Sequence, residues 1–134
     1  MLNIIGIDHL VLRTTQLKLM LNFYCDVLGC SIERSTPPDI GLTQLRAGSA
    51  LIDLVTVNSL LGKMGGGAPT QKDNNLDHFC LRLESISNED LKEHLLANNI
   101  ALGDIGDRYG AQGMGSSVYI QDPDGNTVEL RSTI

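Results

Sequence analysis

A seven-residue pattern that occurs twice constrains the fold of this chain more than any other feature. The stretch 7–13 (Ile-Asp-His-Leu-Val-Leu-Arg) recurs 69 residues later at 76–82 (Leu-Asp-His-Phe-Cys-Leu-Arg), and five of the seven positions are identical or similar in kind. The offset is about half of the 134 residues. Two copies at this spacing predict a chain built from two related halves.

Both halves are expected to follow the order strand, helix, three strands. For the first half the predicted elements are a strand at 6–13, a helix at 17–28 that ends at Gly29, and strands at 30–34, 42–46 and 50–57. For the second half they are a strand at 76–83, a helix at 87–98, and strands at 100–105, 116–121 and 126–132. Apolar residues lie on both sides of the first strand, so we expect it to be buried on both faces.

Local composition predicts how these elements begin, end and pack. Ser87 is a suitable N-cap, and the helix after it is expected to bury a stripe of three leucines, Leu91, Leu95 and Leu96. The glycine-rich stretch 61–75 predicts a connector without regular structure. Four glycines between 106 and 115 predict a loop, with Arg108 and Tyr109 at the surface.

Composition narrows the class of partner. Ten basic and sixteen acidic residues give a formal charge of −6, which argues against a nucleic-acid surface or a basic membrane anchor. The sequence has no run of eighteen apolar residues, so we expect no membrane span. The N-terminus lacks a signal-peptide pattern. The three cysteines match no metal or redox spacing, so we expect reduced thiols in a cytoplasmic protein.

Each half supplies one histidine on its first strand and one carboxylate on its last: His9 with Asp53, and His78 with Glu129. The spacings, 44 and 51 residues, are similar enough to mark the same place in the same unit. Two imidazoles and two carboxylates suit a divalent metal such as Ni, Zn, Co, Mn or Fe. A single strand histidine is more often a hydrogen-bonded structural residue. Four matched polar groups in apolar strands favour the metal site instead.

Four stretches of the chain resemble the vicinal oxygen chelate superfamily, which includes glyoxalase I, extradiol dioxygenases, fosfomycin-resistance proteins and bleomycin-resistance proteins. They are Asp-His-Leu-Val-Leu at 8–12, Phe-Tyr-Cys-Asp-Val-Leu-Gly at 23–29, Leu-Asp-His-Phe at 76–79 and Asp-Pro-Asp-Gly-Asn-Thr-Val-Glu-Leu at 122–130. The resemblance covers nearly the whole chain and is specific for the superfamily rather than for one member.

The resemblance implies an α+β fold of two βαβββ modules whose curved mixed sheets form a cup around one metal ion. The single domain 1–134 then divides into module one at 4–60, the connector at 61–75 and module two at 76–134. The resemblance also implies metal ligands at the four residues that the spacing indicated: His9, Asp53, His78 and Glu129. Asp53 replaces the longer glutamate usual in glyoxalase I, so His9, His78 and Glu129 alone could form a dioxygenase-like set.

The function implied is a glyoxalase-like lyase or isomerase that chelates a small substrate through adjacent oxygens and stabilises an enediolate-type intermediate. Glu129 is the expected catalytic base and Asp53 the second candidate. The alternatives are a ring-cleaving dioxygenase and a non-enzymatic resistance protein that binds small molecules. We also expect a homodimer.

Four side chains share the strand face of the predicted ligands and are candidates for substrate binding: Arg13, Arg82, Tyr119 and Arg131. Their charge favours an anionic small molecule. The alternative for each arginine is a solvated strand end or a salt bridge.

Overall fold

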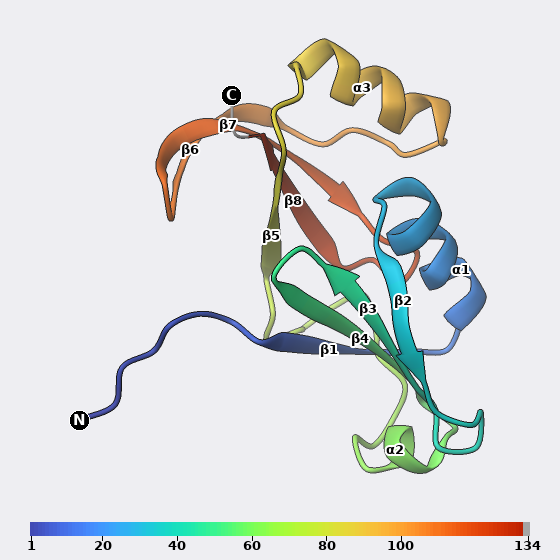
Figure 1. Ribbon diagram of the computed structural model, residues 1–134. Coiled ribbons are helices and arrows are strands. Elements are labelled where there is room, and N and C mark those ends of the chain that lie inside the picture. The colour runs from blue at the N-terminus through green and yellow to red at the C-terminus, as the bar shows by residue number, and fades with distance from the viewer. Residues whose placement is uncertain (133–134) are drawn as a thin grey trace. The chain divides into compact units, whose positions relative to one another are not determined.

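Each half of the chain forms its own four-stranded mixed sheet (Figure 1). The computed structural model describes residues 1–132 and divides the chain into two compact units, 1–69 and 70–134. Residues 133 and 134, at the end of the predicted second module, lie outside the described residues. The two repeated strand sets confirm the predicted α+β fold.

Unit 1 has the strand order β1-β4-β3-β2, in which β1 and β4 are parallel and the other pairs antiparallel. Its strands are β1 (His9–Thr14), β2 (Ser31–Ser35), β3 (Leu42–Ala47) and β4 (Ala50–Thr56). Its helical elements are α1 (Leu17–Leu21), the π-helix η1 (Asn22–Val27) and α2 (Leu60–Lys63). Gly29 ends the helical stretch at φ +86°, as predicted.

Unit 2 repeats this topology with the order β5-β8-β7-β6, again with its first and last strands parallel. Its elements are β5 (His78–Leu83), α3 (Asn88–Ala97), β6 (Ile105–Gly110), β7 (Gly113–Gln121) and β8 (Thr127–Ser132). The Ser87 hydroxyl accepts a hydrogen bond from the Asp90 N–H at 3.1 Å, so the predicted N-cap of α3 is confirmed.

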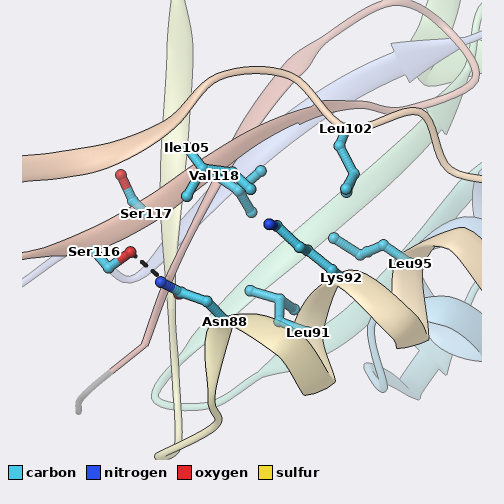
Figure 2. Close-up of a pocket in the computed structure, with 9 residues that line it drawn as sticks. All are labelled: Asn88, Leu91, Lys92, Leu95, Leu102, Ile105, Ser116, Ser117 and Val118. Carbon is cyan, nitrogen blue, oxygen red and sulfur yellow. Dashed lines mark hydrogen bonds between the residues drawn. The ribbon is translucent and has the colours of Figure 1, made fainter.

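Alternate residues of each strand face opposite sides of the sheet, and one side is apolar. In unit 2, Val118 and Ile105 of the sheet lie opposite Leu91 and Leu95 of α3, as Figure 2 shows. Leu95 is fully buried and Val118 is 3% exposed. The other side of each sheet carries the polar residues that we consider below.

Two predictions about packing are wrong. The first strand is not buried on both faces, because Val11 is 50% exposed while its neighbour Leu12 is buried. Leu96 is not part of the buried stripe of α3, because it is 59% exposed. In both elements only one face is buried.

The predictions for the two glycine-rich stretches also need correction. The connector begins with the short helix α2, capped by the Ser59 hydroxyl. Residues 106–115 are not a loop, because they include β6 and the start of β7, and no strand covers 100–104. Glycine normally weakens a strand. Here a Cβ on Gly110 or Gly115 would lie 2.9 Å or 3.0 Å from the guanidinium of Arg131, so these glycines make room for that side chain.

The packing of α3 predicts a contrast between two adjacent leucines. Leu95→Ala should lower the free energy of unfolding by about 2–5 kcal/mol, because it removes buried methyl groups and leaves a cavity. Leu96→Ala should change it by no more than about 0.5 kcal/mol, because Leu96 is a surface residue. Urea unfolding of both variants measures the difference, and equal losses would contradict this packing of α3.

Candidate metal centre

The parallel pairing of β1 with β4 brings His9 and Asp53 onto one face of the unit 1 sheet. His9 lies in register with Leu51, so Asp53 is two residues further along the neighbouring strand and its side chain points to the same side. Asp53 is 3% exposed, whereas the His9 side chain is 48% exposed. The first predicted pair therefore combines an accessible imidazole with a buried carboxylate.

Unit 2 repeats this register with His78 and Glu129. His78 lies opposite Thr127, and Glu129 follows two residues later on β8. The His78 Nε2 atom is 3.3 Å from the Glu129 Oε2 atom, and Glu129 is 7% exposed. The two halves thus place a histidine and a carboxylate in the same relative positions, each within its own sheet.

The aspartate before each histidine contacts the imidazole. Asp8 Oδ1 lies 2.6 Å from His9 Nδ1, and Asp77 Oδ2 lies 2.7 Å from His78 Nδ1. The hydrogen bond with Asp8 raises the pKa of His9 above its ordinary value, and the charge of Asp53 adds to the effect. A carboxylate on one ring nitrogen commonly orients a metal-binding histidine and directs the other nitrogen toward the metal. The Asp-His repeat was visible in the sequence, but the contact of each aspartate with its imidazole was not predicted.

Asp53 has an incomplete set of hydrogen bonds. Gln44, its register neighbour on β3, donates from Nε2 to Asp53 Oδ2 at 3.1 Å. Asp53 Oδ1 is buried and has no hydrogen-bond partner. A buried carboxylate oxygen without a partner is costly. A metal ion is one ligand that would satisfy it.

Glu129 has further neighbours that the sequence did not reveal. Tyr119 is its register partner on β7, and the Tyr119 ring packs edge-on against His78 with centroids 5.3 Å apart. On the other side, Cys80 pairs with Glu129 in the ladder. Burial raises the pKa of the Cys80 thiol to about 11, and the Glu129 carboxylate adds to this shift. Cys80 is therefore largely protonated at neutral pH.

The four predicted substrate contacts lie in different surroundings. Tyr119 adjoins His78, as described. Arg131 is buried and donates a hydrogen bond to the Gly113 carbonyl, and Arg82 is its exposed neighbour on β5. Arg13 instead donates to the backbone carbonyls of Gly62 and Gly66, at 3.1 Å and 2.6 Å, and so fastens the connector to β1.

Arg108 is a polar residue that sequence reasoning assigned to a surface loop. It lies on β6, and its guanidinium is 4.3 Å from the centre of the Tyr119 ring. No local signal in the sequence could have found it, because Gly106 and Gly110 flank it and glycine is depleted in strands.

The described part of the chain offers pairs of ligands rather than a complete cluster. Among residues 1–132, no three or more His, Cys, Asp or Glu side chains gather into a group that could hold a metal ion.

Among these described residues, no helix has the length and apolar character to span a membrane.

The family model of the Glyoxalase/Bleomycin resistance protein/Dioxygenase superfamily matches residues 6–130. The chain belongs to this superfamily. The expected family resemblance is thereby confirmed, and both histidine-carboxylate pairs lie inside the matched region.

The proteins to which the chain is similar have names that describe different activities or none. The chain is 32% identical over 128 residues to biphenyl-2,3-diol 1,2-dioxygenase 3 of Rhodococcus globerulus, an alignment that covers 92% of this chain and 60% of the relative. An integron cassette protein from V. cholerae has a TM-score of 0.76 at 24% identity, with 100% and 99% of the two chains covered. Lactoylglutathione lyase of Agrobacterium tumefaciens has a TM-score of 0.65 at 20% identity, with 96% and 94% covered. The two structures establish the shared fold alone.

The contact between Gln44 and Asp53 leads to a prediction for stability. Gln44→Leu should lower the free energy of unfolding of the metal-free protein by about 1–3 kcal/mol, because it leaves both Asp53 oxygens without a partner. Gln121→Leu, at an exposed position of β7, is the matched control and should have little effect. Urea unfolding measures both. A Gln44→Leu variant as stable as the control would show that Gln44 does not support Asp53.

Proposed function

We propose that the two histidine-carboxylate pairs act together on one divalent metal ion, contributed by one chain or by two copies in a homodimer. His9, Asp53, His78 and Glu129 would be its ligands. The observation that carries this proposal is Asp53 Oδ1, a buried carboxylate oxygen without a partner, on the same sheet face as His9. The equivalent register of His78 and Glu129 supports it.

We further propose that the protein is a lyase or isomerase of a small substrate with two adjacent oxygens. When bound, a divalent ion would polarise those oxygens and favour removal of a neighbouring proton. The protein's own groups would hold and move that proton. Glu129 is the first candidate for the base and Asp53 the second, since both are carboxylates in largely water-excluded positions.

The neighbouring residues have supporting roles in this proposal. Asp8 and Asp77 would orient the two imidazoles through Nδ1. Tyr119 would offer its phenol group to an oxygen of the substrate, because its ring adjoins His78. Arg82 and Arg131 share the face of Glu129, whereas Arg13 would act by fastening the connector.

A ring-cleaving dioxygenase is the second candidate, and the 32% identity to the R. globerulus enzyme favours it. The chain spans 60% of that relative's length. A set of two histidines and one carboxylate is sufficient for non-haem Fe(II) oxygenases. In that case His9, His78 and Glu129 would hold iron, and Asp53 would be no ligand.

Calorimetric titration of the chelator-treated protein with Zn²⁺, Ni²⁺ or Co²⁺ tests the proposal. Loss of an outer-shell partner of a metal ligand costs roughly 10–100-fold in metal affinity, and we expect His78→Ala, which removes a ligand, to cost more. Asp53→Asn should weaken metal binding as well. His94→Ala, on α3, is the control and should bind as the unaltered protein does. No metal binding by the unaltered protein would overturn the proposal.

Asp53→Asn also separates the two candidates. If Asp53 is dispensable for Fe²⁺ binding and the iron-loaded protein consumes O₂ with 2,3-dihydroxybiphenyl, the dioxygenase replaces the lyase. Turnover of the hemithioacetal of methylglyoxal and glutathione by the Ni²⁺ or Zn²⁺ protein, lost in Asp53→Asn, supports the lyase.

A further inference from the structure

The polar face of the unit 2 sheet is arranged in rows that run across its strands. The ladder partners define three successive rows: His78 with Thr127 and Gln121; Cys80 with Glu129 and Tyr119; and Arg82 with Arg131 and Ser117. The third row thus begins with two arginines side by side. It lies two residues beyond Glu129, about 7 Å along the strand.

Gly106 is the β6 partner of Ser117 in this third row, and the side chain of Arg108, two residues further along β6, reaches back to it. Its Nη1 atom donates to the carbonyl oxygen and to the hydroxyl of Ser117, each at 2.9 Å. Its guanidinium also lies over the Tyr119 ring, at 4.3 Å. The third row therefore holds Arg82, Arg131 and the guanidinium of Arg108, which we call the arginine row.

The arginine row is positively charged, whereas the unit that contains it is acidic overall. Residues 70–134 contain eleven acidic and five basic residues, and the row gathers all three arginines of that unit. Like charges repel, so placing them together on one face is unfavourable without a compensating anion. The acidic composition of the unit does not supply one for Arg131. Among residues 1–132, no carboxylate forms an ion pair with Arg131, although Arg131 is only 6% exposed.

The available protein partners neutralise little of this charge. Arg131 donates to the Gly113 carbonyl, and Arg108 pairs with Asp104 at 2.7 Å. The Asp104 side chain is 82% exposed, so water competes for that ion pair. Buried arginines are ordinarily paired with an anion.

The backbone around Arg131 is shaped to hold its guanidinium on this face. A Cβ on Gly110 would lie 2.9 Å from Arg131 Nη1, and a Cβ on Gly115 would lie 3.0 Å from Nη2. Any larger residue at either position would displace the guanidinium. Two glycines in adjacent strands, β6 and β7, thus keep space for one buried cation.

We propose that the arginine row is an anion subsite that takes a carboxylate, phosphonate or phosphate group. Guanidinium groups bind such planar or tetrahedral oxyanions through paired, charge-assisted hydrogen bonds. That this anion is part of the substrate rests on the proposed function. The substrate class is then a small organic anion whose charged group lies about 7 Å, one row, from the oxygens near Glu129.

Titration of the metal-free full chain with inorganic phosphate, and separately with malonate, tests the subsite. Calorimetry gives the affinity, and NMR of the arginine Nε–H groups locates the binding. We expect saturable shifts at Arg82, Arg108 and Arg131, and none at Arg34, an exposed arginine of unit 1. Tighter binding of phosphate would assign a phosphate or phosphonate group, and tighter binding of malonate a carboxylate.

Variants distinguish the arginine row from general charge attraction. Arg131→Met should weaken anion binding about 10-fold to 100-fold, and Arg131→Lys should weaken it less. Arg82→Met, at an exposed position, should also weaken it, whereas Arg34→Met should not. Unsaturable shifts spread equally over all arginines, or unchanged affinity in Arg82→Met, would overturn the subsite. Because no metal is present, this result is independent of the metal titration of His78→Ala.

Discussion

The parallel pairing of the first and last strands in each unit is the constraint on which the rest of the candidate site depends. It sets a histidine on an edge strand diagonally across from a carboxylate on the neighbouring strand, on the face that the helix does not cover. A slip of one residue in either ladder would move the carboxylate to the apolar face. The buried rows of Ile52, Leu54, Val128 and Leu130 fix that register and so fix the polar face.

The two units use this common geometry differently. In unit 2, Glu129 contacts His78 and lies among Tyr119, Cys80 and the arginine row. In unit 1, Asp53 is held by Gln44 on one oxygen, and the other oxygen has no partner. Under the proposed function, unit 2 would hold the reacting and charged parts of a substrate, and unit 1 would supply the other metal ligands.

Much of the fold could be predicted because the repeat and its strand pattern are local features of the sequence. The Asp-His copies, the cap at Ser87 and the turn at Gly29 each depend on a few adjacent residues. The hairpin of β6 and β7 could not be predicted in the same way. Its glycines indicate a loop when read locally, and only the position of Arg131 on β8 explains why they occur in strands.

The same limit applies to the candidate site. The four proposed ligands followed from matched spacing, but Gln44 contacts its ladder neighbour Asp53 and Arg108 contacts Ser117 on the adjacent strand, and no sequence separation indicates either contact. Arg13 was predicted to contact a substrate because it shares the strand face of His9. Its guanidinium instead donates hydrogen bonds to backbone carbonyls of the connector. Side-chain partners across strands depend on register, which is a property of the folded sheet.

The central claim is that two equivalent pairs, one from each unit, serve one metal ion. X-ray absorption spectroscopy of the protein loaded with one equivalent of Zn²⁺ or Co²⁺ counts the imidazole ligands directly. The account predicts two imidazoles per ion with oxygen atoms completing the shell, and one imidazole in either His9→Ala or His78→Ala under saturating metal. A single imidazole in the unaltered protein, or two independent ions per chain, would contradict it.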